Sequence, residues 1–182
     1  MKKFSSKFLD LASKGGQVEN WGEIKGFPGY SVSDLGHVRN DETGRVLTIL
    51  RNQYGTCYVG LTKGRKQHRR SLAQLVAQTF VPNPRAKDSF DGLIHLNNDK
   101  ANNRADNLLW RPHWFVVKYL IQANRGPIGS DKPVLEIKHH EIYPNTWEAS
   151  LAFGLIERDL IGSIVNRTFT WPTFQEFRYV AE

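Results

Sequence analysis

Short stretches of alternating apolar and polar residues run through the chain between positions 21 and 70. Residues 30–33 alternate in this way, and the Asp-Leu-Gly sequence at 34–36 supplies a turn before the chain returns. The same alternation recurs at 45–50 and 55–62. Because successive side chains on a strand point to opposite faces, the pattern predicts a small antiparallel sheet with basic side chains on one face.

The pattern changes to a helical period directly after this segment. Side chains of one stripe recur at i, i+3, i+4, i+7 and i+8, in Leu72, Leu75, Val76, Thr79 and Phe80. This stripe predicts an amphipathic helix at 72–80, which Pro82 and Pro84 end.

Two short apolar strands are predicted next, at 93–96 and 108–111, on either side of a loop rich in Asn and Asp. Proline is favoured at the first position of a helix, so Pro112 opens a predicted helix that runs to about Gln122. The order of elements is strand, loop, strand, helix.

A stretch containing Gly and Pro, at 124–133, predicts a linker to a separate C-terminal segment. Asn145 with Glu148 three residues later marks a helix start, and Gly154 ends that helix. The other elements predicted for this segment are a strand at 134–138, a second helix at 159–167 and an aromatic strand at 174–179. Two short helices joined by a tight turn have the outline of a helix-turn-helix.

Composition narrows the class of protein. The chain has 182 residues, of which 40% are hydrophobic, and a single cysteine, Cys57. One cysteine excludes an intramolecular disulfide and a zinc site built on several thiolates. No apolar run approaches the roughly 18 residues of a membrane span, and the start of the chain lacks the apolar core of a signal peptide. We therefore expect a soluble, cytoplasmic protein with no membrane partner.

Positive charge is concentrated in the first part of the chain. The formal net charge is +7, with +10 on residues 1–130 and −3 on residues 131–182. A basic segment at 39–70 holds 8 basic and 2 acidic side chains. This composition predicts contacts to DNA phosphates, the alternative being a solvated basic surface. The candidate DNA-binding residues of the segment are Arg39, Arg45, Arg51, Lys63, Arg65, Lys66, Arg69 and Arg70.

The most specific motif is the sequence IHLNNDKANNRADNLLW at 94–110. It resembles the core of the HNH endonucleases, and of the phage-type homing endonucleases in particular. The sequence GFPGYSVSDLGHVR at 26–39 resembles the small N-terminal module that often precedes such cores, and residues 132–179 resemble the helix-turn-helix module that often follows them. The resemblance implies a DNA-binding protein that acts on duplex DNA, in a phage-infected bacterial host.

The fold class expected from these elements is α+β. It comprises a small N-terminal antiparallel sheet, a ββα-metal (HNH-like) core and a C-terminal helix-turn-helix with flanking strands. The domain ranges expected are a leader at 1–20, the basic sheet module at 21–70, the HNH-like core at 71–123, the linker at 124–133 and the helix-turn-helix module at 134–182.

The resemblance also implies a chemistry, hydrolysis of a phosphodiester with one Mg²⁺ or Mn²⁺ ion. His95 matches the family's general base, and Asn107 matches the asparagine that pins the loop so that the imidazole points at the scissile phosphate. The alternative for His95 is a histidine packed in the hairpin and bonded to Asn107.

Two positions that hold metal ligands in relatives are occupied by Ile94 and Val116, which cannot bind a hard cation. Substitute ligands are conceivable in Asp91, Asp99 and His113, although His113 is also explained as a surface residue at the start of a helix. In the C-terminal module the candidate DNA-binding residues are Arg158, Asn166 and Arg167. Its net negative charge leaves a protein partner as the alternative.

Two hypotheses of function follow. The first is a Mg²⁺-dependent DNA nickase with His95 as base. The second is a catalytically silent HNH relative that keeps the scaffold to bind DNA, or another protein, as a regulator. The missing ligands favour the second hypothesis, whereas the retained His95 and Asn107 favour the first.

Overall fold

A computed structural model describes residues 18–83 and 85–180 of the chain, so the predicted leader at 1–20 lies almost entirely outside the described residues. The chain divides into two compact units, with the boundary between Val116 and Val117. We call residues 17–116 the N-terminal unit and residues 117–182 the C-terminal unit. The boundary falls inside a helix, whereas the domain ranges from the sequence place breaks at other positions; those ranges stay a prediction.

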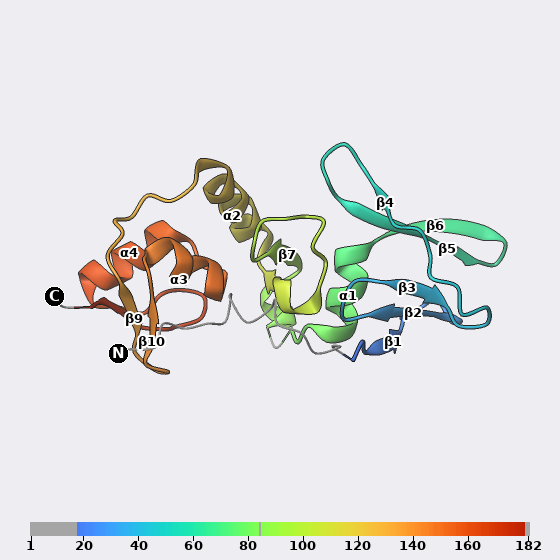
Figure 1. Cartoon of the computed structure of the whole chain (residues 1–182), viewed down its shortest axis with the longest axis horizontal. Helices are drawn as coiled ribbons and strands as arrows, with labels where there is room; N and C mark the ends of the chain where they lie inside the picture. Colours follow the sequence, from blue (N-terminus) through green and yellow to red (C-terminus); the bar gives the residue numbers. More distant parts are fainter. Residues whose placement is uncertain (1–17, 84, 181–182) are drawn as a thin grey trace. The chain divides into compact units, whose positions relative to one another are not determined.

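The N-terminal unit begins with two three-stranded antiparallel sheets where the sequence predicted one sheet (Figure 1). The first sheet contains β1 (Trp21–Glu23), β2 (Tyr30–Ser33) and β3 (Val38–Asn40), and the second contains β4 (Leu50–Arg51), β5 (Cys57–Lys63) and β6 (Lys66–Ser71). The turn between β5 and β6 places Gly64 and Arg65 in left-handed backbone, with φ of 56° and 63°. Two such residues in succession are typical of the tight hairpin turn that matches strand twist.

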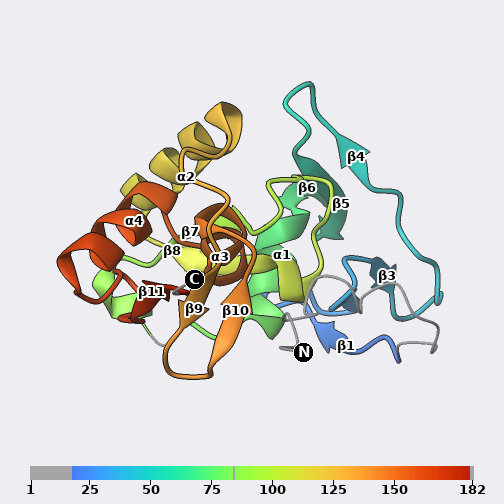
Figure 2. The same cartoon turned by 60° about the vertical axis from the view of Figure 1, so that its left-hand side comes forward.

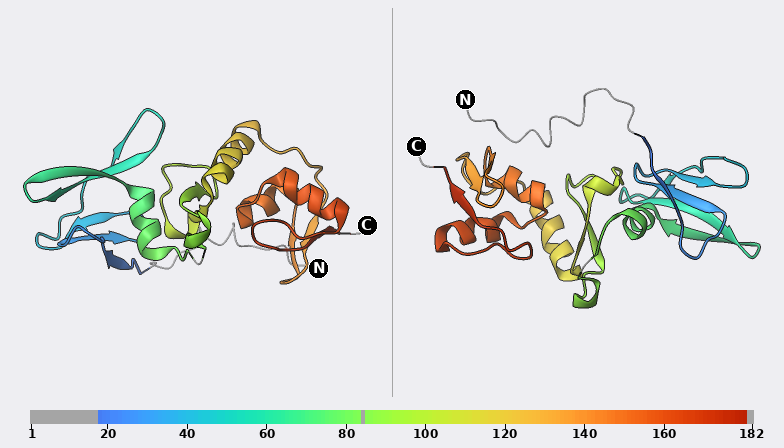
Figure 3. Two further views of the ribbon diagram at one scale, coloured as in Figure 1. Left: turned by 180° about the vertical axis from the view of Figure 1, so that it is seen from behind. Right: turned by 90° about the horizontal axis from the view of Figure 1, so that it is seen from below.

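Helix α1 (Leu72–Phe80) lies beside both sheets, as Figures 1 and 3 show. Its position agrees with the predicted amphipathic helix. One buried cluster joins it to both sheets and to Leu108, with Val32, Val59, Leu61 and Val76 among its other members. The two sheets, α1 and Leu108 therefore share a single hydrophobic core.

The predicted strand, loop, strand and helix follow, as β7 (Gly92–His95), β8 (Leu108–Arg111) and α2 (His113–Arg125). Two short 3₁₀ turns, Ala86–Asp88 and Ala105–Asn107, precede the two strands. The strands pair antiparallel with Ile94 opposite Leu109 and His95 opposite Leu108. Because side chains alternate along a strand, Ile94 and His95 lie on opposite faces of this hairpin.

The C-terminal unit contains the sheet β10 (Glu141–Tyr143), β9 (Val134–Glu136) and β11 (Phe177–Tyr179) in that order. Figure 2 shows α3 (Thr146–Phe153) and α4 (Glu157–Asn166) beside this sheet. Asn145 caps α3 by accepting a hydrogen bond from the Glu148 amide at 2.9 Å, as the sequence predicted. None of the helices in the described part of the chain is both long and apolar enough to cross a membrane.

Candidate functional site

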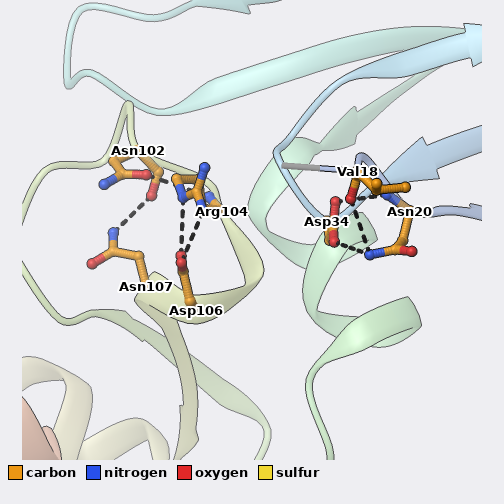
Figure 4. A network of polar contacts seen from close by, with 7 residues as sticks. All are labelled: Val18, Asn20, Asp34, Asn102, Arg104, Asp106 and Asn107. Atoms are coloured by element: carbon orange, nitrogen blue, oxygen red, sulfur yellow. Dashed lines mark hydrogen bonds and ion pairs between the residues drawn. The ribbon is translucent and has the colours of Figure 1, made fainter. Parts of the chain in front are cut away.

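The loop between β7 and β8 is pinned by a buried asparagine. Asn107 Oδ1 accepts a hydrogen bond from the Asn97 amide at 3.0 Å, and Asn107 Nδ2 donates to Asn97 Oδ1 at 2.9 Å and to the Asn102 carbonyl at 2.8 Å. Figure 4 shows Asn107 turned toward Asn102. A side chain that serves three polar groups of the loop fixes its shape, which is the role that the family resemblance implies for Asn107.

His95 ends β7 and is bonded to a different asparagine from the one expected. Its Nε2 lies 3.1 Å from Asn103 Oδ1. Burial lowers the pKa of His95 below its usual value and outweighs the Asn103 hydrogen bond and the nearby Asp99 carboxylate, which raise it. The imidazole is therefore neutral at neutral pH, as a proton acceptor must be.

The two positions assigned to metal ligands by resemblance are apolar and closely packed. Ile94 is 2% exposed. Gly92 lies on the same face of β7, and a Cβ atom added to it would lie 2.7 Å from Val116 Cγ2 and 3.0 Å from the Arg111 carbonyl oxygen. The first turn of α2 therefore rests directly on this face of the strand. Because hard cations take oxygen or nitrogen ligands, the donors at this face do not fit a divalent metal.

The substitute ligands expected from the sequence, Asp91, Asp99 and His113, are exposed side chains. Asp99 Oδ1 accepts a hydrogen bond from the Ala101 amide at 2.8 Å, which uses it within its own turn. Across residues 18–83 and 85–180, no three His, Cys, Asp or Glu side chains form a group that could hold a metal ion. The three candidates are therefore not brought together as a ligand set.

Most of the candidate DNA-binding cations of the first two sheets are exposed, and Arg39 is half-buried. Several lie over aromatic rings: the Arg69 guanidinium is 3.9 Å from the Tyr58 ring centre, and that of Arg70 is 5.0 Å from Phe27. Arg39 lies 4.3 Å from the Trp21 ring and also pairs with Asp41 at 3.1 Å. Cation–aromatic contacts hold the Arg69 and Arg70 side chains without neutralising them, so their charge is available to an anion, whereas that of Arg39 is paired with Asp41.

The strand register corrects the expectation that basic side chains share one face of the sheet. Arg69 lies opposite Gly60 and Arg70 lies opposite Val59, so they point to opposite faces. Val59 is fully buried and its face carries the core, whereas Tyr58 and Gly60 belong to the outer face. The inner-face cations stay accessible because β6 is an edge strand.

The candidates of the C-terminal unit lie on and directly after α4. Arg158 and Asn166 are exposed on this helix, and Arg167 follows it in left-handed backbone with a φ of 55°. Arg158 also lines a cleft of about 210 Å³ with Arg125 of α2, a residue that the sequence did not single out. Part of the acidic charge of this unit is buried: Glu157 is 1% exposed and accepts hydrogen bonds from Thr146 Oγ1 and the Ile128 amide, both at 2.8 Å.

Asn103 is the residue of the loop that sequence reasoning missed. It is 4% exposed, and its side chain contacts His95 although eight residues separate the two in the chain. The only signal was its membership of the Asn-rich loop, in which Asn97, Asn98 and Asn102 are equally conspicuous.

The chain is similar to several known proteins. A family model for the NUMOD4 motif matches residues 19–62. Two uncharacterized HNH endonucleases of Acanthamoeba polyphaga mimivirus are 29% and 38% identical over 68% and 50% of the chain, which spans only 34% and 23% of their length. The DNA endonuclease I-HmuI of Bacillus phage SP01 is 30% identical over 74% of this chain and 83% of that protein. A solved structure showing DNA binding and cleavage by the HNH homing endonuclease I-HmuI covers 90% of this chain and is itself 99% covered, at 25% identity and a TM-score of 0.49.

The hairpin β7–β8 followed by α2, with a histidine at the end of its first strand and a loop pinned by Asn107, defines an HNH-type ββα fold. The similarity to the phage endonuclease extends over most of both chains. The chain belongs to the HNH homing endonuclease family. The family and the α+β fold class expected from the sequence are thus confirmed. HNH endonucleases generally use a divalent metal ion. This chain has apolar residues at 94 and 116, the two positions where the resemblance implies metal ligands.

Proposed function

We propose that this chain binds duplex DNA through the second sheet of the N-terminal unit and does not cut it by the metal-dependent route. The observation that carries the binding is the set of exposed cations on β4, β5, β6 and their turn, several held over aromatic rings. Beyond Tyr58 only β5 and β6 are paired, so this end of the sheet is a two-stranded ribbon. Such a ribbon is narrow enough to enter the major groove, and Lys and Arg side chains neutralise phosphates on either side of it. The similarity to a phage DNA endonuclease supports the same partner.

The proposed lack of catalytic activity rests on the face of β7 that packs against α2. A phosphodiester cut of this kind needs a cation to stabilise charge on the phosphate oxygens. Ile94 and Val116 offer hydrocarbon where a cation would need oxygen or nitrogen. No neighbouring acidic or imidazole group of the described chain replaces them as a set.

DNA binding and its independence of metal are tested together by fluorescence anisotropy with a labelled duplex, measured in Mg²⁺ and again in EDTA. We expect the same affinity in both buffers and a steep fall in affinity with rising salt, because phosphate contacts release counterions. An affinity that collapses in EDTA would place a metal in the complex, and an affinity insensitive to salt would remove the basic sheet from the interface.

Nicking of DNA is the second candidate function, and the neutral His95 with its pinned loop favours it. Supercoiled plasmid incubated with Mg²⁺ or Mn²⁺ separates the two candidates, with the His95→Ala variant run beside the wild type. We expect no nicking by either protein. Nicking by the wild type that His95→Ala abolishes would establish the enzyme instead.

The modular organisation is part of the proposal: a basic sheet module at 21–70, an HNH-like core at 71–123 and a helix-turn-helix module at 134–182. Within the last module, Arg158, Asn166 and Arg167 contact DNA, with a protein partner as the competing role. Crosslinking of this module to a bound duplex distinguishes the two. Relatives from a phage and from a virus support a place of action inside an infected host cell.

A further inference from the structure

Asn103 has one orientation open to its side chain amide. Asn103 Nδ2 donates to the carbonyl oxygens of Lys100 at 3.2 Å and Ala101 at 3.1 Å. An amide nitrogen that faces two acceptors cannot exchange places with its oxygen without setting oxygen against oxygen. Asn103 Oδ1 is therefore the atom presented to His95.

The orientation of this amide decides which imidazole nitrogen carries the proton. An amide oxygen can only accept a hydrogen bond, so His95 Nε2, at 3.1 Å, must be the donor. In a neutral imidazole the other nitrogen then carries the lone pair. His95 Nδ1 has no hydrogen-bond partner among residues 18–83 and 85–180, which leaves that lone pair available.

Asn103 is in turn held by the turn between β2 and β3. The Ala105 amide donates to the Asp34 carbonyl at 2.8 Å, which ties this turn to the loop. Gly36 has a φ of +88°, and a Cβ atom added to it would lie 3.2 Å from the Asn103 carbonyl oxygen and 3.5 Å from Asn103 Cβ. Figure 4 shows the same turn from the side of Asp34, whose carboxylate accepts two hydrogen bonds from Asn20.

We infer that Asn103 is the positioning residue of His95, that it holds the neutral imidazole with its proton on Nε2, and that the turn at 34–36 of the first sheet keeps Asn103 in place. The NUMOD4 motif matched at 19–62 then has a second role, since its turn supports the HNH-like loop as well as building a sheet. This inference rests on the proposed assignment of the site to His95, but it concerns the free protein and is independent of DNA binding.

The test is ¹⁵N NMR of the histidine rings in the full-length protein at alkaline pH, where the imidazole is neutral. In the wild type we expect His95 Nε2 to give the protonated nitrogen resonance and Nδ1 the unprotonated one. Asn103→Ala removes the acceptor, so both resonances move toward the average of two exchanging tautomers.

Asn102→Ala is the matched control for this series. It removes an asparagine side chain one position away, whose own hydrogen bond to the Arg104 amide is 3.5 Å long. We expect the His95 resonances to stay unchanged. A wild-type proton on Nδ1, or an Asn103→Ala spectrum equal to that of the wild type, overturns the inference.

The turn is tested separately, with Gly36→Ala and Gly44→Ala. Both glycines have positive φ, so both variants carry similar backbone strain, but a Cβ on Gly44 meets nothing within 4 Å. We expect only Gly36→Ala to shift the His95 resonances. Equal His95 resonances in the two variants would exclude the turn from the positioning of His95. Fluorescence anisotropy on the same samples reports separately whether the proposed DNA binding holds.

Discussion

The two faces of the hairpin β7–β8 differ in their chemistry: one carries a hydrogen-bonded histidine and the other packs apolar side chains against α2. On one face His95 is hydrogen-bonded to Asn103, and in the adjoining loop Asn107 is hydrogen-bonded to Asn97 and Asn102. On the other face Ile94 lies on the side of the strand that packs against Val116. The side chain of Asn107 stabilises the loop whether or not a reaction takes place, because it makes hydrogen bonds to backbone groups of the loop. A metal ligand contributes only when the metal is bound, so it can be replaced by hydrocarbon without loss of the fold.

The largest effect is expected when the face of the hairpin that carries Ile94 is made polar. The double substitution Ile94→Asp with Val116→Asn introduces oxygen donors at the two apolar positions, the first of which is next to His95 in the chain. We expect Mg²⁺-dependent nicking of supercoiled DNA to appear, from none detectable in the wild type. We also expect a loss of about 3 kcal/mol in unfolding free energy without metal, because a carboxylate is buried.

The control for this variant is the same protein with His95→Ala, which should not nick. Urea unfolding with and without Mn²⁺ reports metal binding directly, since a ligand of the native state raises stability. No stabilisation by Mn²⁺ and no nicking would show that more than two side chains separate this site from an active one.

Asn107→Ala removes the side chain that holds the loop between β7 and β8. Its removal leaves the Asn97 amide and the Asn102 carbonyl without their partner, and we expect a loss of about 2–3 kcal/mol in unfolding free energy. Chemical denaturation measures it. Asn102→Ala should cost under about 0.5 kcal/mol, and equal losses for the two variants would contradict the pinning role of Asn107.

DNA affinity should be governed by the sheet and not by either face of the hairpin. We expect Arg69→Gln with Arg70→Gln to weaken duplex binding about tenfold, and to lower the slope of log affinity against log salt by about 1.8 if each contacts one phosphate. Lys87→Gln removes an exposed cation outside both sheets. Anisotropy titrations at several salt concentrations should show little change for that control, and an equal loss would reduce the effect to net charge.

The smallest effect is expected for His95→Gln. His95 is partly buried and bonded within the loop, so its replacement should change duplex affinity by no more than about twofold. The same titration measures it. A tenfold loss would place the hairpin in the DNA interface, and DNA binding would then not be separate from the site at His95.

Periodicity along the chain found most of the elements. It predicted a strand at 45–50, where the structure has only the short strand β4 (Leu50–Arg51), and it did not predict β10. The stripe beginning at Leu72 predicted α1, and Asn145 with Glu148 predicted the start of α3. The resemblance of residues 94–110 to the HNH core identified the family, and it implied the roles of His95 and Asn107 and the two ligand positions occupied by Ile94 and Val116. These signals are local, because helix period, caps and short motifs depend on neighbours within a few residues.

The sequence by itself determined the family, the α+β class and the absence of suitable donors at Ile94 and Val116. The three-dimensional structure was needed to show that residues 21–71 build two sheets on a shared core, that Arg69 and Arg70 point to opposite faces, and that Asn103 bonds His95. Which of several asparagines reaches the imidazole depends on how the loop closes and on the turn at Gly36 that packs against it. Such a contact joins residues far apart in the chain, and no period in the sequence encodes it.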